Sequence, residues 1–455
     1  MTDTIVAIST PPGQSGIGLV RLSGHQAISI VASVFFSPKG VDLFKMPSHK
    51  LTYGFIRQED GDNIDEVLVT VMRRPSTYTR EDIVEINAHG GIVPLRETLR
   101  LLIRQGARLA QPGEFTKRAF LNGRLDLAQT EAVADFIRAK TINQARIAMR
   151  QLKGGLSQEI SKIRDDILDI LAELEAAIDF PEEVLEINSN QVRLAKLKEV
   201  SSRIEKLLSQ AGRGRLLTEG ARVVIAGRPN VGKSSLLNTL LSRERAIVTP
   251  FPGTTRDTIE EEIEIDGYLV KLIDTAGWRE PLDPIEREGI KRTEESVRES
   301  DLVIFLLDGG EGVTTKDREL FSSLNGQKII VAINKIDLPL KLREGELGHL
   351  FPDKPVVKIS ATQKINIEGL LKLIRDFLEG EPLESEIITA LRHEEILKSV
   401  AGSIREAITA LEKSRGEEFI SLELREGLSK LGEITGEVYT EDILDKIFSR
   451  FCIGK

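Results

Sequence analysis

Eight consecutive residues near the middle of the chain, from Gly227 to Ser234, match the phosphate-binding pattern Gly-x4-Gly-Lys-Ser/Thr. Glycines in such a loop let backbone N–H groups close around phosphates at a helix N-terminus, where the helix dipole also favours anions. Lys233 is expected to reach the β- and γ-phosphates, and the Ser234 hydroxyl to bind Mg²⁺. The pattern predicts nucleotide binding and phosphoryl chemistry.

Three further nucleotide-binding elements follow the loop. They are Asp274-Thr275-Ala276-Gly277, Asn334-Lys335-Ile336-Asp337 and Ser360-Ala361. Asp274 is expected to hold Mg²⁺ through water, and Gly277 to donate its N–H to the γ-phosphate. Asp337 is expected to select guanine, because a carboxylate accepts hydrogen bonds from the ring N–H and the exocyclic amine that adenine lacks. Order and spacing together predict GTP binding.

The elements that position these residues are apolar strands and a helix. Residues 222–226 read as a buried strand that feeds the loop, and 235–241 as the helix after it. Residues 269–273 and 328–333 read as strands that deliver Asp274 and Asn334 to the carboxyl edge of a sheet. Nucleotides bind at that edge in open α/β sheets, so we expect a Ras-like, doubly wound P-loop domain.

Composition limits the class of protein. A chain of 455 residues has room for about three domains. It has no apolar run of 18 residues and no signal-peptide pattern, so we expect a cytoplasmic protein with no membrane partner. Cys452 is the single cysteine, which excludes an internal disulfide framework. The net charge of −9 disfavours binding of nucleic acid through bulk charge but leaves a local basic patch open.

Four segments follow from the hydrophobic pattern: an α+β domain over 1–118, a helical segment over 119–217, the GTPase domain over 218–378, and a second helical segment over 379–455. The first segment mixes short strand-like runs with helices near 25–35 and 92–105. Neither helical segment covers its own apolar stripe. We therefore expect the two to pack together, with the GTPase domain inserted in one helical domain. Two separate helical linkers are the alternative.

Two positions of the GTPase domain are unusual. Trp278 stands where Ras-like switches carry the glutamine that orients the attacking water, so hydrolysis is feeble or the water is held from elsewhere. Carboxylates within 279–288 are candidates, although solvated loop charges explain them equally well. Asn230 could offer its side-chain oxygen to a monovalent cation, with backbone carbonyls of 249–255 completing the site. Asparagine at that place also occurs in P-loops that do not use potassium.

The motifs together resemble the MnmE (TrmE) family of tRNA modification GTPases. The matching segments are 3–7 (DTIVA), 10–13 (TPPG), 112–129 (PGEFTKRAFLNGRLDLAQ), 227–235 (GRPNVGKSS), 252–257 (PGTTRD), 274–277 (DTAG) and 451–455 (FCIGK). The GTP motifs alone also fit Era- and Der-like GTPases, whereas the N-terminal and C-terminal signatures single out this family. The resemblance covers essentially the whole chain.

The resemblance implies a three-part architecture and a homodimer formed through the N-terminal domains. Those domains are similar to folate-binding domains and would hold a 5-formyl-tetrahydrofolate-type cofactor. It further implies a partner, an FAD- and NADH-dependent flavoprotein of the MnmG (GidA) type. Together the two proteins would add an aminomethyl or carboxymethylaminomethyl group at C5 of the wobble uridine (position 34) of certain tRNAs. GTP hydrolysis would be stimulated by K⁺.

Residue roles implied by the resemblance follow the matched positions. Glu286 would orient the attacking water through a second water. The implied K⁺ ligands are Asn230, Thr249, Phe251 and Thr254, and the Mg²⁺ ligands are Ser234 and Thr255. The implied folate contacts are Arg21, Glu81, Arg124 and Lys455. Arg124 stands where relatives are expected to have lysine, which keeps the charge but changes its geometry. Without the resemblance, surface salt-bridge partners would explain these side chains.

The full set expected to bind GTP comprises Asn230, Val231, Gly232, Lys233, Ser234, Ser235, Thr249, Thr254, Thr255, Asp274, Thr275, Ala276, Gly277, Asn334, Lys335, Asp337, Ser360 and Ala361. Cys452 is either a buried apolar residue or a functional thiol, and its place in a terminal tail favours a catalytic role whose chemistry stays open. His89 reads as a structural residue. No His/Cys cluster predicts a zinc or iron–sulfur site.

An Era/Der-like regulatory GTPase of ribosome assembly is the alternative function. It predicts an RNA-binding KH-like domain or tandem GTPase domains. The sequence has one GTPase domain and no Gly-x-x-Gly loop in a basic setting. The N-terminal α+β domain has no role in that alternative, so the sequence favours a GTP hydrolase that acts in tRNA modification.

Overall fold

The computed structural model describes residues 3–179, 190–243, 260–274, 296–342, 344–379 and 388–455. The chain divides into two compact units. The first comprises Met1–Ala134, Gln151–Asn190 and Glu406–Lys455, and the second comprises Asp135–Arg150 and Gln191–Arg405. Some predictions therefore concern residues outside the described ranges, namely those for Thr249, Phe251, Thr254, Thr255 and the 275–295 segment.

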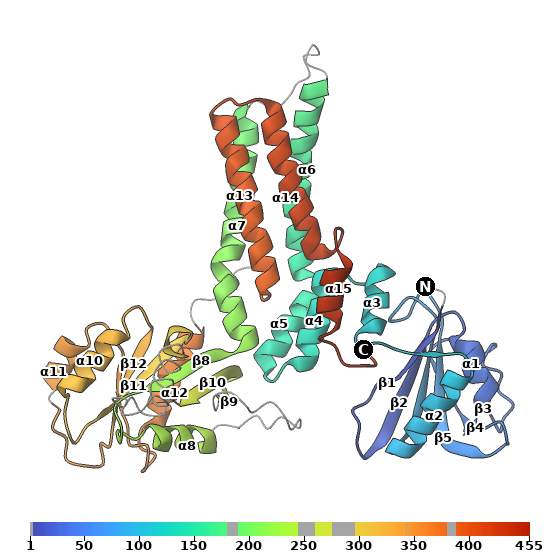
Figure 1. Ribbon diagram of the computed structural model, residues 1–455, viewed down its shortest axis with the longest axis horizontal. Coiled ribbons are helices and arrows are strands. Elements are labelled where there is room, and N and C mark those ends of the chain that lie inside the picture. The colour runs from blue at the N-terminus through green and yellow to red at the C-terminus, as the bar shows by residue number, and fades with distance from the viewer. Residues whose placement is uncertain (1–2, 180–189, 244–259, 275–295, 343, 380–387) are drawn as a thin grey trace, which may run out of the picture. The chain divides into compact units, whose positions relative to one another are not determined.

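The N-terminal domain is a seven-stranded sheet with two helices on one face (Figure 1). Its strands are β1 (Ile5–Ile8), β2 (Ser15–Ser23), β3 (Phe35–Phe36), β4 (Lys50–Arg57), β5 (Asn63–Met72), β6 (Ile83–Gly90) and β7 (Arg108–Leu109), in the order β3-β4-β5-β6-β2-β1-β7. All neighbours pair antiparallel except β1 and β7. The helices are α1 (Ala27–Val34) and α2 (Ile92–Arg104). The predicted α+β fold of this part is confirmed.

Alternation along the strands explains how this sheet has one covered and one open face. In β5, Val67, Val69 and Val71 are buried, whereas Glu66 before them and Leu68 between the first two are exposed. Side chains of successive strand residues point to opposite faces, so the valines face the core with α1 and α2. The open face carries Arg21 of β2 and Glu85 of β6, which are in register.

Eight further helices are described outside the N-terminal sheet domain and the GTPase domain. They are α3 (Glu114–Leu121), α4 (Leu127–Arg138), α5 (Ile142–Leu152), α6 (Gly155–Asp179), α7 (Asn190–Glu219), α13 (Leu391–Glu412), α14 (Glu417–Thr435) and α15 (Glu441–Phe448). The predicted boundary at residue 118 falls inside α3, and α7 runs two residues past 217. None of the described helices is long and apolar enough to cross a membrane.

Within the first unit, α6 packs along α14, so a segment before the GTPase domain lies against one after it. Ile160, Ile163 and Ile167 of α6 are fully buried at the predicted spacing of three and four residues. At the solvent side Glu175 accepts a hydrogen bond from Ser421 and pairs with Arg425 at 2.8 Å. This packing is the arrangement that the insertion hypothesis requires.

A buried arginine joins α3 to the N-terminal sheet. The Arg118 side chain has no exposed surface, and its guanidinium lies 2.8 Å from Asp3, 3.2 Å from Glu81 and 3.0 Å from Glu114. Removing one partner of a buried ion pair costs about 3–5 kcal/mol, because the charge left behind has no compensation. Arg108 adds a second cation on Asp3 and Glu114. The network fixes the start of the helical region on the sheet.

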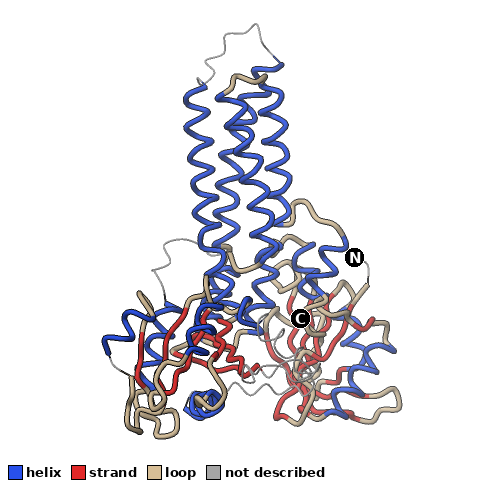
Figure 2. The backbone as a smooth tube through the Cα atoms, turned by 60° about the vertical axis from the view of Figure 1, so that its left-hand side comes forward, coloured by secondary structure: helices blue, strands red, loops and turns tan. Residues whose placement is uncertain are grey.

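The GTPase domain is a six-stranded sheet in the order β13-β12-β11-β8-β10-β9. Its strands are β8 (Ala221–Ala226), β9 (Glu260–Ile265), β10 (Tyr268–Asp274), β11 (Leu302–Asp308), β12 (Ile329–Asn334) and β13 (Val356–Lys358), and its helices are α8 (Lys233–Arg243), α10 (Thr315–Ser323), α11 (Glu344–Leu350) and α12 (Ile367–Glu379). Figure 2 shows these strands running between helices. Separate apolar cores lie on the two faces of the sheet. The predicted doubly wound fold is confirmed.

Candidate functional site

The phosphate-binding loop lies between β8 and α8, where the strand order reverses. β8 pairs with β10 on one side and β11 on the other, all in parallel, so its carboxyl end is the switch point at which α/β sheets bind ligands. α8 begins at Lys233, one residue after Gly232. The Lys233 ammonium is buried and donates to the carbonyls of Gly227 and Arg228, at 2.9 and 3.0 Å. The loop is thus closed around its own lysine, with Ser234 and Ser235 following in the first helical turn.

Asn334 fastens this loop to the last GTP element. Its side-chain amide donates to the Val231 carbonyl, and its side-chain oxygen accepts from the Ala361 N–H, both at 2.9 Å. Gly232 has a φ of 102°, and a Cβ there would stand 2.3 Å from the Asn334 amide nitrogen. Only glycine therefore permits this approach. The structure brings three of the predicted elements together around one buried asparagine.

Lys335 makes a second connection to the loop. Its ammonium donates to the Asn230 carbonyl at 2.9 Å and to the Asp308 carboxylate at 2.6 Å. Asn230 itself has a φ of 65°, which asparagine tolerates better than most residues. Asp308 ends β11 and is in register with Asn334 on β12. Burial raises the pKa of Asp308, but the Lys335 ammonium and backbone N–H groups outweigh it and hold that pKa below its ordinary value.

Arg228 ties the loop to α10. Its guanidinium donates to Asp317 at 2.7 Å and to Glu311 at 3.1 Å. Asp317 is fully buried and forms a capping box with Thr314 at the start of α10. The Arg228 carbonyl meanwhile accepts from Lys233. One end of the 308–317 segment thus holds Lys335 and the other holds Arg228.

The remaining GTP elements are placed only in part. Asp274 ends β10 in register with Ile225, which sets its backbone beside the strand that feeds the loop. Asp337 is exposed three residues after Asn334, and Ser360 pairs with Ile365 by two backbone hydrogen bonds. The other predicted site residues lie outside the described ranges. They are Thr249, Phe251, Thr254, Thr255, Thr275, Ala276, Gly277, Trp278 and Glu286.

The C-terminal tail docks on the N-terminal domain. The Gly454 carbonyl accepts from the Ser9 hydroxyl at 3.1 Å and from Arg21 at 3.5 Å, and the Cys452 carbonyl accepts from the Gly113 N–H at 3.4 Å. Gly113 has a φ of 70°, and a Cβ there would lie 2.9 Å from the Phe448 carbonyl. The approach of the tail therefore requires glycine. Cys452 is exposed, so it is not the buried apolar residue that a lone cysteine usually is.

Two of the four residues implied for folate come together at this tail. Arg21 pairs with Glu85 at 2.7 Å. Burial lowers the pKa of Lys455, and the Arg21 charge lowers it further. Glu81 instead accepts from Ser23 at 2.7 Å and from Arg118, while the Arg124 guanidinium lies 4.7 Å from the centre of the Tyr78 ring. The four side chains share the N-terminal domain but have different partners.

Two other predictions from the sequence concerned His89 and metal binding. His89 Nδ1 lies 2.6 Å from Asp65, whose hydrogen bond and charge raise the pKa of the imidazole. No group of three or more His, Cys, Asp or Glu within the described ranges could hold a metal ion.

Sequence reasoning missed Asp308, Asp317 and Arg118. Asp308 carried a signal, because it directly ends an apolar strand in the way that Asp274 does. The other two carried only weak local signals, a Thr-x-x-Asp capping pattern at Asp317 and a Glu114–Arg118 spacing of four residues, while their further partners lie 89 and 115 residues away in the chain.

The fold and site define a P-loop GTPase joined to an α+β domain through helices. The model of the GTP-binding protein TrmE N-terminus matches residues 4–124, and that of the MnmE helical domain matches residues 127–452. The tRNA modification GTPase MnmE of Thermoanaerobacter pseudethanolicus is 47% identical over 100% of this chain and 99% of its own. That of Ligilactobacillus salivarius is 45% identical over 100% and 98%. A crystal structure of Aquifex aeolicus Era bound to GDP and AlF4⁻ is 32% identical over 40% of this chain and 66% of its own, with a TM-score of 0.30.

The chain therefore belongs to the MnmE (TrmE) family of tRNA modification GTPases. It binds GTP and is a GTP hydrolase that acts in tRNA modification.

Asp308→Asn tests the connection between Lys335 and the loop. Loss of the charge partner frees the Lys335 ammonium, and the affinity for GTP should fall about tenfold, the effect of one charge-assisted hydrogen bond. Titration with a fluorescent GTP analogue measures this. Asp266→Asn is the matched control, because its pair with Arg375 is largely exposed and its loss should leave affinity within about twofold. Wild-type affinity in a folded Asp308→Asn protein would contradict the assignment.

Proposed function

We propose that this GTPase, together with an FAD- and NADH-dependent MnmG (GidA)-type flavoprotein, adds an aminomethyl or carboxymethylaminomethyl group at C5 of the wobble uridine of certain tRNAs in the cytoplasm. The observation that carries the proposal is one chain that joins a GTP-binding P-loop domain to a TrmE-type N-terminal domain over the full length of its relatives. A GTPase that only regulated assembly would not need the second domain.

A 5-formyl-tetrahydrofolate-type ligand fits the N-terminal domain. Arg21 and Lys455 supply cationic donors beside the docked tail, and Arg124 supplies a third on the same domain. Folates carry carboxylates, for which guanidinium and ammonium groups are the natural partners. Glu81 would accept from donors of the pterin ring, provided it exchanges its bond to Ser23. Bound folate would carry a one-carbon unit. The exposed Cys452 thiol would act beside it.

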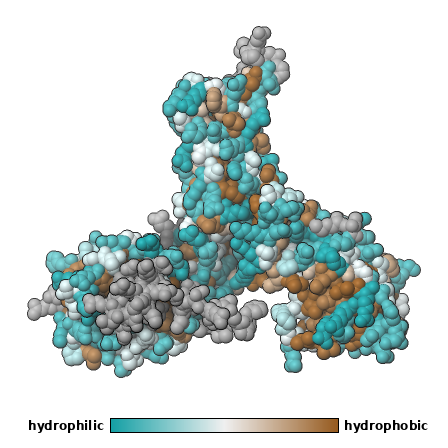
Figure 3. All heavy atoms as spheres, in the orientation of Figure 1, coloured by the Kyte–Doolittle hydropathy of each residue, from teal (hydrophilic) through white to brown (hydrophobic). Residues whose placement is uncertain are grey.

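Homodimerisation through the N-terminal domains is supported by exposed apolar side chains. Figure 3 shows apolar side chains gathered over this domain. Leu51, Tyr53 and Leu68 on β4 and β5 are 61%, 42% and 43% exposed, and Tyr53 lies opposite Leu68 in the ladder. Exposed apolar patches of this kind mark protein–protein contacts. Sedimentation of the full-length chain should give the mass of two chains, and a monomer at micromolar concentration would remove this part of the proposal.

A bound K⁺ would supply the positive charge that an arginine side chain supplies in other GTPases. Asn230, held by Lys335 through its carbonyl, would offer its side-chain oxygen to K⁺ beside the phosphates, with Thr249, Phe251 and Thr254 completing the site. Ser234 and Thr255 would hold Mg²⁺. Glu286 would orient the attacking water in place of the glutamine that Trp278 replaces.

Nucleoside analysis of tRNA tests the proposed function. In cells that lack this protein, C5-aminomethyl-type groups should disappear from the wobble uridine and return with the wild-type gene. The gene for the Asp337→Asn variant should fail to restore them, because this variant should no longer recognise the guanine base of GTP. Full modification of these uridines in the deletion strain, with no second enzyme present, would show that the chain serves another process.

The rate of GTP hydrolysis in K⁺ and Na⁺ tests the cation site. The wild-type rate should be at least about tenfold higher in K⁺, because one added positive charge stabilises the transition state. Asn230→Ala should remove the difference while the rate in Na⁺ stays unchanged. Equal rates of the wild-type protein in the two salts would refute the cation mechanism.

A further inference from the structure

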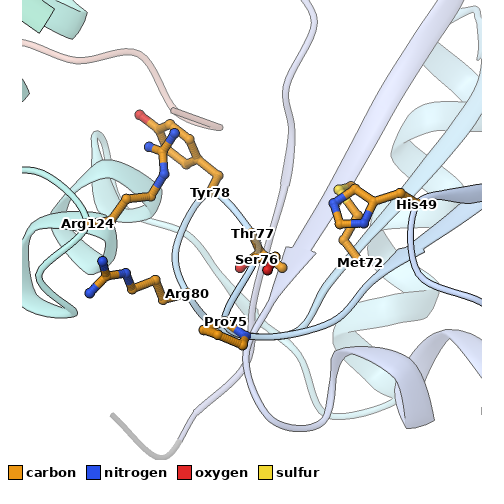
Figure 4. A pocket seen from close by; sticks show the side chains of 8 residues that line it. All are labelled: His49, Met72, Pro75, Ser76, Thr77, Tyr78, Arg80 and Arg124. Carbon is orange, nitrogen blue, oxygen red and sulfur yellow. The ribbon is translucent and has the colours of Figure 1, made fainter. Parts of the chain in front are cut away.

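A cavity of about 450 Å³ opens on the N-terminal domain beside the segment that joins β5 to β6. Its lining residues are His49, Met72, Pro75, Ser76, Thr77, Tyr78, Arg80 and Arg124. Figure 4 shows Arg124 next to Tyr78, with Arg80 near them and His49 and Met72 on the opposite side. The volume is within the range of small-ligand sites.

The lining is cationic and contains no carboxylate. Arg80 donates to the backbone carbonyl of Asn122 at 2.9 Å, and Arg124 lies over the Tyr78 ring. Among the described residues neither guanidinium forms an ion pair, although the chain as a whole carries a net charge of −9. Two uncompensated guanidinium groups at one cavity attract an anion, and their planar forks suit carboxylates.

The backbone of the lining is unusual at two positions. His49 and Arg80 have φ values of 64° and 59°, in the left-handed region that costs free energy for a residue other than glycine. Local hydrogen bonds hold both: the His49 imidazole lies 2.8 Å from the Ser48 hydroxyl, and the Thr77 hydroxyl donates to the Glu81 carbonyl at 2.6 Å. Strained residues of this kind cluster at ligand sites, where the surroundings fix them in place.

Tyr78 connects the cavity with the residues implied for folate. Its hydroxyl lies 3.0 Å from the Thr116 hydroxyl, and its ring packs in the same core cluster as Phe115. The Arg21 guanidinium lies 5.8 Å from the centre of the Phe115 ring. Arg124 belongs both to the implied folate contacts and to the cavity. A folate-type ligand that contacts Arg124 therefore reaches this cavity.

We propose that this cavity binds the carboxylates of the glutamyl residues beyond the first in a polyglutamylated folate-type ligand, and that Arg80 is a tail-binding residue. The proposal rests on the proposed folate site and adds the part of that site that binds the glutamyl tail. A tRNA phosphate is the other anion to consider, but RNA backbones are followed by extended basic surfaces, whereas only two guanidinium groups line this open cavity.

The test compares 5-formyl-tetrahydrofolate carrying one and three glutamyl residues, titrated calorimetrically into the full-length protein. The wild-type protein should bind the triglutamate about tenfold more tightly, the effect of one charge-assisted bond. Arg80→Asn removes the charge while suiting the left-handed backbone, so it should abolish this tail advantage and leave monoglutamate affinity within about twofold. Arg80→Lys should retain part of the advantage.

Arg100→Asn is the matched control, because Arg100 lies on α2 of the same domain with an exposed partner, Glu97. It should keep the full tail advantage, and GTP hydrolysis of every variant should be normal. Equal wild-type affinities for the two folates, or an advantage that survives Arg80→Asn, would overturn the proposal while the folate site stands. Weaker tRNA binding by Arg80→Asn with an unchanged tail advantage would make the cavity an RNA site. No folate binding at all would overturn the proposed folate function itself.

Discussion

Two side-chain hydrogen bonds to backbone carbonyls hold the phosphate loop, one from Asn334 to Val231 and one from Lys335 to Asn230. Both donors stand at the carboxyl end of β12, which is in register with β11. A loop with glycine at 232 and a left-handed Asn230 has no regular backbone ladder of its own, so its shape depends on these contacts. The element predicted to select guanine thus also shapes the phosphate-binding loop.

Charge compensation organises the N-terminal domain in the same way. The buried Arg118 is acceptable only because Asp3, Glu81 and Glu114 surround it. Its pairing fixes α3 on the sheet, and α3 in turn packs against α15, which leads into the docked tail. Arg80 and Arg124 line a cavity of the same domain and form no ion pair among the described residues. These two arginines belong to the site that we propose for the ligand tail.

Sequence patterns predicted the parts of the molecule that depend on local order. The motif spacing gave the P-loop, the Asn334 element and the sheet edge that carries them, and the 3/4 spacing of isoleucines gave α6. The contacts of Asp308 with Lys335 and of Asp317 with Arg228 could not be predicted, because strand register and helix packing bring those partners together. The contact of the tail with Ser9 spans 445 residues, and only the resemblance to the family pointed to it. The catalytic position of Glu286 stays a prediction.

The measurement that tests the account most directly is the nucleotide preference of Asp337→Asn. The Asp337 carboxylate is predicted to accept hydrogen bonds from the two donors of guanine, whereas an amide would donate to the extra carbonyl of xanthine. The variant should therefore lose affinity for GTP by about a hundredfold and bind xanthosine triphosphate instead. The variant should then hydrolyse xanthosine triphosphate in place of GTP. Unchanged selectivity for GTP in a folded variant would contradict the assignment of the guanine site, and with it the arrangement in which β12 both selects the base and holds the phosphate loop.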